Sequence, residues 1–231
     1  MLIALPNLDG SFTCTLFMPF EGENSFASLN DRPKLEAFFK ENLPDTIDVI
    51  PDLAQDFFKN PTSTLVTMKC FPYTFEDKIA LIGDACHAIV PFYGQGMNAG
   101  FEDITILYEM MQKYGNDWKT IFSEYEKSRK PNADAIAELS YRNFMEMSTK
   151  TADPNFILQK KIEKRFAEKY PEKWIPLYDR VTFSTRPYSE ALAIGDLQEI
   201  IMQEILAIEN IAQIWDSELI EQKILEKLAV L

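Results

Sequence analysis

One stretch of the chain, residues 79–103, constrains the fold more than any other. It opens with an apolar run from Ile79 to Ile82, which is typical of a buried strand, and this run ends at Gly83. A loop with turn-forming residues follows, and apolar residues then recur at helical spacing from 97 to 113. Because Gly115 can provide a C-cap, the sequence predicts the order strand, acid, glycine-containing loop and helix.

That order suits a planar ring with a polyol tail. Asp84, expected at the strand end, can accept hydrogen bonds from ribityl or sugar hydroxyls, while Gly94 and Gly96 let backbone N–H groups approach a planar ligand. The start of the helix adds a positive dipole that stabilises an anion. Gly100, inside the helix, indicates a close neighbour such as a ligand. An ordinary strand–loop–helix connection has the same pattern, so the residues alone leave both interpretations open.

Several residues of this stretch form a recognisable pattern. They are Gly83-Asp84-Ala85-Cys86-His87, Pro91, Gly94-Gln95-Gly96, Asn98 and Asp103. The pattern resembles the second flavin motif of the single-component FAD-dependent aromatic hydroxylases. The resemblance implies an α+β fold that corresponds to the C-terminal portion of such a hydroxylase: a substrate-domain β-hairpin or sheet, a flavin-binding strand–loop–helix and a helical C-terminal region. It also implies FAD as the cofactor and NADPH as the co-substrate.

The resemblance assigns roles to individual residues. It implies that Asp84 binds the ribityl chain and that the loop borders the flavin ring. It also implies that the pyrimidine end of the ring faces the first amides of the helix. The implied cofactor-binding residues are Asp84, Pro91, Gly94, Gly96, Met97 and Asn98. The residues expected to border the reacting oxygen, without acting as acid or base, are Pro91, Phe92, Gln95 and Gly96. We interpret His87 as a structural hydrogen-bonding residue rather than a proton shuttle.

The chain begins with a predicted β-hairpin. Two β-rich segments, 1–6 and 11–18, flank a turn at 7–10. The period of two places alternate residues of each strand on one face, and packing into a core is the simplest reading of that face. The hairpin also resembles the substrate-domain hairpin of the aromatic hydroxylases, in which one face lines the aromatic pocket. The corresponding residues are Ile3, Leu5, Thr15 and Phe17.

The second half of the sequence is predicted to be helical. One helix carries Asn143 and Met147 on the same face, and from the pattern alone Met147 is a core residue. The segments 141–147 and 175–178 are similar to those of the hydroxylases that act on L-kynurenine, where each offers a polar group to the amino-acid end of the substrate. The resemblance therefore implies that Asn143, Met147 and Tyr178 contact the substrate.

Three parts are expected along the chain: residues 1–78 as part of a substrate-binding sheet domain, 79–115 as the flavin-binding strand–loop–helix, and 116–231 as a helical C-terminal region. A long strand is predicted from Thr62 to Tyr73, where apolar and polar residues alternate.

Composition excludes several classes of function. The 231 residues, 46% of them hydrophobic, are enough for a substantial core, and a net charge of −13 disfavours nucleic acid and anionic membranes. No apolar run approaches the roughly 20 residues that span a bilayer, so no membrane anchor is expected. Three widely spaced cysteines and a single histidine argue against disulfides and a zinc site, and favour a cytoplasmic protein.

Taken together, the resemblance implies an NADPH- and FAD-dependent monooxygenase that uses O2 to hydroxylate the ring of L-kynurenine. The Gly-x-Gly-x-x-Gly turn that grips the ADP half of FAD is absent, so we expect the chain to correspond to about the C-terminal half of the enzyme. Two alternatives stay open: a hydroxylase of another aromatic acid, such as a hydroxybenzoate, and an inactive module that binds no FAD. The sequence also leaves a homodimer open.

Overall fold

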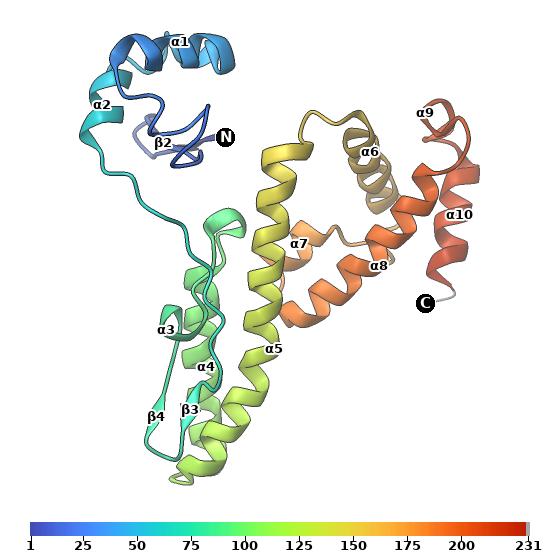
Figure 1. The fold of residues 1–231 in the computed structure, drawn as a ribbon. Helices are drawn as coiled ribbons and strands as arrows, with labels where there is room; N and C mark the ends of the chain where they lie inside the picture. Colours follow the sequence, from blue (N-terminus) through green and yellow to red (C-terminus); the bar gives the residue numbers. More distant parts are fainter. Residues whose placement is uncertain (230–231) are drawn as a thin grey trace. The chain divides into compact units, whose positions relative to one another are not determined.

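A computed structural model describes residues 1–229 of the chain. It divides into two compact units, Met1–Thr64 and Leu65–Leu231, each with its own hydrophobic core (Figure 1). The predicted functional division into residues 1–78, 79–115 and 116–231 stays a prediction, because compactness alone does not assign roles to the parts.

The first unit is a hairpin beside two helices. Strands β1 (Leu2–Pro6) and β2 (Phe12–Leu16) pair antiparallel, and helices α1 (Arg32–Asn42) and α2 (Leu53–Lys59) follow, with the short 3-10 turn η1 (Pro44–Thr46) between them. The core cluster of this unit consists of Leu29, Leu35 and Phe39, with Leu16 and Met18 packed against it.

The register of the hairpin confirms the predicted faces. Ile3 lies opposite Thr15, and Leu5 lies opposite Thr13, so these side chains share one face of the sheet. Leu16, which packs against the core of the unit, belongs to the other face. The face that carries Ile3 is therefore not the one on the core cluster, and Leu5 is 58% exposed.

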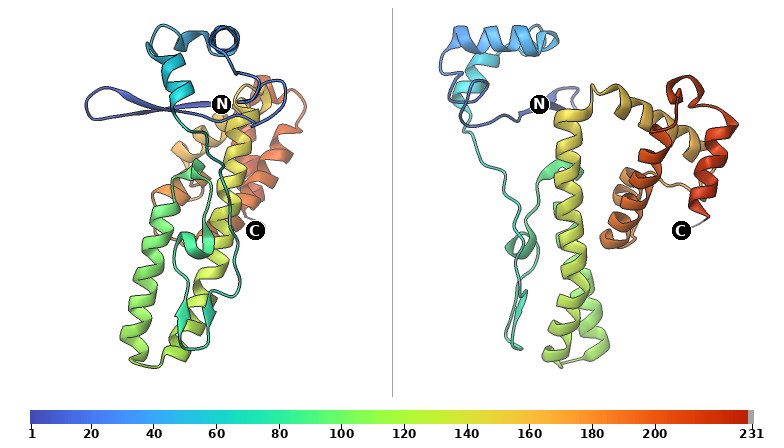
Figure 2. Two further views of the ribbon diagram at one scale, coloured as in Figure 1. Left: turned by 60° about the vertical axis from the view of Figure 1, so that its left-hand side comes forward. Right: turned by 45° about the vertical axis from the view of Figure 1, so that its right-hand side comes forward.

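The second unit is mostly helical, as predicted for the C-terminal region. Helices α4 and α5 pack side by side, and α5 also packs against α8 (Figures 1 and 2). The elements in chain order are β3 (Thr74–Phe75), β4 (Ile79–Ala80), α3 (Asp84–His87), η2 (Pro91–Tyr93), α4 (Gly96–Tyr114), α5 (Trp118–Met145), η3 (Glu146–Lys150), α6 (Pro154–Lys169), α7 (Leu177–Thr182), α8 (Tyr188–Leu206), α9 (Ile211–Ile214) and α10 (Glu218–Leu228).

Local signals explain where the two central helices begin and end. Helix α4 stops at Gly115, whose φ of 62° suits a residue without a side chain. The carboxylate of Asp117 then accepts a hydrogen bond from the N–H of Thr120 and caps α5. Helix α5 continues for 28 residues through Pro131.

The last helices form a separate cluster within this unit. Trp174 is 1% exposed and packs with residues of α6, α8 and α10, including Phe166 and Ile201. On α10, the nearly buried Glu221 pairs with Arg165 and Lys169 of α6, which neutralise its charge. Among the helices of residues 1–229, none is both long and apolar enough to cross a membrane.

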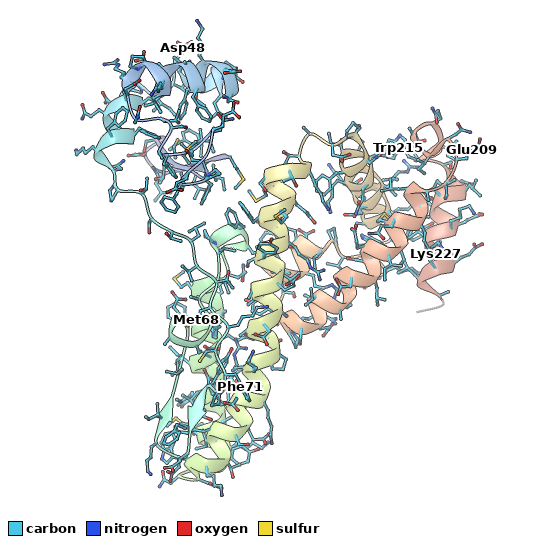
Figure 3. The ribbon with its side chains drawn as sticks, viewed as in Figure 1. Asp48, Met68, Phe71, Glu209, Trp215 and Lys227 are labelled. Carbon is cyan, nitrogen blue, oxygen red and sulfur yellow. The ribbon has the colours of Figure 1, made fainter. Side chains whose placement is uncertain are left out.

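The predicted strand from Thr62 to Tyr73 is wrong. The segment is extended but irregular, and two backbone bonds tie it down: Met68 N–H to the carbonyl of Ala88, and Cys70 N–H to the carbonyl of Cys86. Met68 and Phe71 keep exposed side chains (Figure 3). An alternating pattern becomes a strand only beside a partner strand. Within the described residues this segment has none.

The predicted buried strand at Ile79 is also wrong in part. Only Ile79 and Ala80 are extended as β4, paired with β3, and the Ile79 side chain is 55% exposed. A short apolar run indicates burial only when both of its faces are covered, and here one face of the two-stranded ribbon is open.

Candidate functional site

The turn after β4 has the conformation that its sequence suggests. Gly83 has a φ of +60°, which a residue with a side chain rarely adopts. Asp84 follows as the first residue of α3, so its predicted place at a strand end is corrected to a helix start. The Asp84 carboxylate is exposed, and no side chain among residues 1–229 donates a hydrogen bond to it. It is free to accept hydrogen bonds from a ligand.

Gly100 of α4 lies against this turn. A Cβ built on Gly100 would come 3.6 Å from the Cα of Gly83, which is an ordinary van der Waals contact. The close neighbour predicted for Gly100 is therefore the chain's own backbone. The helix and the turn approach each other here with no side chain between them.

The loop before α4 is held by one buried amide. Gln95 is 5% exposed, and its Oε1 accepts hydrogen bonds from the Tyr188 hydroxyl at 3.0 Å and from Asn98 Nδ2 at 3.1 Å. The Gln95 side chain does not cap α4. Gly94, with a φ of +67°, lets the chain turn into the helix, and a Cβ there would meet no atom within 4 Å. The first N–H groups of α4 are therefore available to a ligand.

These elements surround a depression of about 650 Å³ in the second unit. The turn, the loop and the start of α4 each contribute to its wall. The lining residues are Ile82, Gly83, Asp84, Ile89, Pro91, Gly94, Gly96, Met97, Gly100, Phe101 and Ile104. Five of the six residues predicted to bind the cofactor are among them. The sixth, Asn98, donates its side-chain amide to Gln95 instead.

The four residues expected to border the reacting oxygen divide into two pairs. Pro91 and Gly96 line the depression. Phe92 and Gln95 do not, and both side chains are buried. The ring of Phe92 packs against Phe144 with the ring centroids 4.7 Å apart. These two side chains support the loop on its buried side, away from the depression. Their roles toward an oxygen remain predictions.

The predicted substrate residues of the second unit gather at the same loop. Nδ2 of Asn143 donates a hydrogen bond to the carbonyl of Phe92 at 2.7 Å, and it lies 3.7 Å from the Sδ atom of Met147. The Tyr178 ring stacks on Tyr93 at a centroid distance of 5.6 Å. Tyr178 is 50% exposed. The structure thus places Asn143 and Tyr178 against the loop, and Met147 beside Asn143.

The other predicted substrate residues belong to the first unit. Ile3, Leu5, Thr15 and Phe17 lie on or beside its hairpin, whereas the depression lies in the second unit. Their contribution to a substrate pocket stays a prediction.

A buried charged group lies behind the turn. Asp103 of α4 is 0% exposed, and its Oδ2 accepts hydrogen bonds from the Gly83 N–H at 2.8 Å and from His87 Nε2 at 2.6 Å. Its Oδ1 accepts from Nε of the buried Arg129 at 2.5 Å. Burial acts to raise the pKa of Asp103, but the donors outweigh burial, and the pKa is held below its ordinary value. Asp103 is therefore a carboxylate at neutral pH.

This cluster is not suited to a metal ion. Cys86, His87 and Asp103 place potential ligand atoms within 4.8 Å of one another. However, Asp103 already accepts from His87, Gly83 and the cationic Arg129, and burial raises the pKa of the Cys86 thiol to about 12. A protonated thiol beside a satisfied carboxylate is a poor ligand set.

Sequence reasoning missed Tyr93, Tyr188 and Arg129. Tyr188 and Arg129 contact the motif residues Gln95 and Asp103 from other elements, and nothing near them in the sequence marks them. Tyr93 lies within the loop itself and stacks on Tyr178. An arginine within a helix usually reads as a solvated residue. The position of Tyr93 within the loop, directly before Gly94, could have indicated a role, but none was assigned to it.

The chain is similar to several known proteins. Residues 31–140 match the FAD binding domain family. Kynurenine 3-monooxygenase of Flavobacterium psychrophilum is 85% identical over 99% of this chain and 51% of that protein. The enzyme of the same name from Flavobacterium johnsoniae is 77% identical over 99% of this chain and 51% of that protein, and that from Dictyostelium discoideum is 46% identical over 89% and 47%.

The match to the FAD binding domain family includes the turn, the loop and the start of α4. Over almost its whole length the chain is similar to part of the kynurenine 3-monooxygenases, and it spans about half the length of the curated relatives it matches. The predicted resemblance to FAD-dependent aromatic hydroxylases is confirmed, and so is the flavin-binding fold.

Proposed function

We propose that the chain contributes the ribityl and ring side of the FAD site, and part of the substrate pocket, to an NADPH-dependent monooxygenase that hydroxylates L-kynurenine to 3-hydroxykynurenine. The observation that carries the proposal is the shared depression. Residues assigned to FAD through separate parts of the motif, from Asp84 to Met97, converge on it. A free carboxylate, two glycines and an uncapped helix N-terminus at one place are typical of a ligand site, because each of them leaves room or hydrogen-bonding groups for a ligand.

The residues present fit FAD. The unpaired carboxylate of Asp84 would accept hydrogen bonds from ribityl hydroxyls, and Gly94 and Gly96 leave space for a flat ring. The N–H groups at the start of α4 would stabilise negative charge on the ring by about 0.3–1 kcal/mol or more. FAD, once reduced by NADPH, would supply the oxygen-transfer chemistry.

The chain's own residues would then shape and dry the site. Pro91 covers one side of the depression, and Met97, Phe101 and Ile104 give it an apolar wall. An apolar wall excludes water and holds an aromatic ring in place. None of these side chains has an acid or base to contribute, so positioning is their whole role.

The polar end of kynurenine requires donors and acceptors. Tyr178 is half exposed beside the loop, and its hydroxyl is the group we assign to the substrate's amino-acid end. Asn143 is already bonded to the carbonyl of Phe92, so we assign it first to holding the loop. Removal of the Tyr178 hydroxyl in Tyr178→Phe should raise the kynurenine dissociation constant several-fold, because one hydrogen bond contributes about 0.5–1.5 kcal/mol.

Two measurements test the function. The purified chain is titrated with FAD, and quenching or a spectral shift of the flavin is expected. A full-length protein that contains this sequence is then assayed for NADPH oxidation stimulated by kynurenine, with 4-hydroxybenzoate as the comparison. Stimulation by hydroxybenzoate alone would favour the hydroxylase of another aromatic acid. A chain and a full-length protein that both leave FAD unchanged would favour the module that binds no flavin.

A further inference from the structure

The buried carboxylate of Asp103 is bonded to the turn that presents Asp84. Its Oδ2 accepts the backbone N–H of Gly83, the residue immediately before Asp84, at 2.8 Å. The same oxygen accepts His87 Nε2, three residues beyond Asp84, at 2.6 Å. One oxygen atom of α4 thus holds the chain on both sides of Asp84.

The carboxylate itself is held in place by Arg129 of α5. Nε of Arg129 donates to Oδ1 of Asp103 at 2.5 Å, Nη1 forms an ion pair with Glu102 at 2.8 Å, and Nη2 donates to the carbonyl of Ala99 at 3.3 Å. Ala99, Glu102 and Asp103 are all on α4. The direction of the carboxylate is therefore fixed relative to the helix whose N-terminus lines the depression.

We propose that Asp103, oriented by His87 and Arg129, is a positioning residue that sets the Gly83 turn and so aims Asp84 into the FAD site. This inference rests on the proposed function. Glycine can adopt many backbone conformations, so a free Gly83 would leave the direction of Asp84 poorly defined. A charge-assisted bond to its N–H selects the conformation with a φ of +60°.

Every partner of the Asp103 carboxylate is a donor. Because Asp103 is ionised and also receives Gly83 and Arg129, Nε2 of His87 carries the proton that it shares with Oδ2. An asparagine in place of Asp103 keeps the size but turns an NH2 group toward at least one of these donors. Asp103→Asn is therefore the variant that removes the function of the carboxylate with little change of volume.

The first experiment needs no FAD. The 15N-labelled chain is compared with its Asp103→Asn variant by amide hydrogen exchange at Gly83. We expect exchange to accelerate by about tenfold or more, as for the loss of one hydrogen bond to a charged group. Glu109→Gln is the control, because Glu109 is an exposed carboxylate of α4 that does not contact the turn, so the Gly83 rate should stay unchanged. Asp103→Ala removes both acceptor oxygens, so an unchanged Gly83 rate in folded Asp103→Asn and Asp103→Ala variants would overturn the proposal.

The second experiment separates aiming from simple stability. FAD dissociation constants are measured in the full-length protein for Asp84→Ala, Asp103→Asn and the double variant. If Asp103 acts through Asp84, each single variant weakens FAD binding by about tenfold or more, and the double variant binds like Asp84→Ala alone. Losses that multiply would mean that Asp103 acts independently of Asp84, which contradicts the proposal.

A third variant covers the case in which Asp103→Asn does not fold. His87→Ala removes one donor and keeps the carboxylate, so the Gly83 exchange rate and the FAD dissociation constant should both rise by a smaller factor, about threefold. No change in either quantity would contradict the proposal. If the full-length parent takes up no FAD, the proposed function fails, while Gly83 exchange still decides whether Asp103 sets the turn.

Discussion

In the first half of helix α4, the two faces reverse the usual pattern of a surface helix. In the second half, Ile106, Leu107 and Met110 pack against a core cluster in the ordinary way. The inner face buries Ala99 and the charged Asp103, both 0% exposed. The outer face exposes Met97, Phe101 and Ile104 by 71%, 61% and 53%. An amphipathic helix normally buries its apolar stripe and solvates its charges. Here the groups that pack against each face of the helix decide which face is buried. The polarity of the face does not decide it.

Each face has a physical explanation. Asp103 can be buried because three donors satisfy it, one of them the cation of Arg129. Met97, Phe101 and Ile104 are not a protein core but one wall of the depression. Helix α4 therefore has a buried polar anchor on one side and an apolar wall of the depression on the other.

Breaking the polar anchor should have the largest effect. Arg129→Met leaves the Asp103 carboxylate buried without its cation, so the free energy of unfolding should fall by about 3–5 kcal/mol. Denaturant unfolding followed by tryptophan fluorescence measures this, because Trp118, Trp174 and Trp215 all lie in the second unit.

The control for that prediction is on the same helix. Arg142 of α5 pairs with Glu138 and Asp196 at an exposed position, so Arg142→Met should cost no more than about 1 kcal/mol. Equal losses for the two arginine variants would contradict the contrast between buried and exposed pairs.

Removing the carboxylate that the anchor presents should change binding rather than folding. In the full-length protein, Asp84→Ala should weaken FAD binding about ten- to a hundredfold, since a hydrogen bond to a charged group is lost. Thermal stability should hardly change, because Asp84 is exposed. Asp77→Ala, at another exposed aspartate, is the control. A flavin titration unaltered by Asp84→Ala would remove Asp84 from the site.

Acid should weaken the anchor. The pKa of Asp103 is lower in the folded chain than its ordinary value of 3.8, so its stabilising contribution is complete above about pH 4 and is lost as the pH falls through the folded pKa. Urea unfolding from about pH 5 to pH 2 should therefore show a steeper loss of stability for the parent than for Asp103→Asn. Parallel curves would mean that another group controls acid unfolding.

The smallest effect is expected on the outer face. Phe101 is mostly exposed, so Phe101→Ser should change the free energy of unfolding by less than about 0.5 kcal/mol. On the inner face, Ala99→Leu adds three carbons to a filled space and should cost about 1–3 kcal/mol. Denaturant unfolding of Phe101→Ser and Ala99→Leu measures both changes. A loss of several kcal/mol in Phe101→Ser would show that the outer face also packs in the folded chain.

The sequence alone predicted what depends on neighbouring residues. The end of α4 follows from Gly115. The hairpin register follows from its turn and its alternation. Much of the depression was also predictable, because a motif of glycines and one acid places its ligand-binding groups within a short stretch of chain.

Only the tertiary structure decided the rest. Asp103 and Arg129, which are buried together, lie 26 positions apart in the sequence. Gln95 and Tyr188, which share a hydrogen bond, lie 93 positions apart. The alternation from 62 to 73 indicated a strand, but a strand needs a neighbour that the pattern cannot supply. Capping and turn preferences are local energies that a sequence states directly. Burial and strand pairing depend on the side chains and strands that another element places beside a residue. In this protein, those partners determined which face of α4 became the buried anchor and which became the wall of the depression.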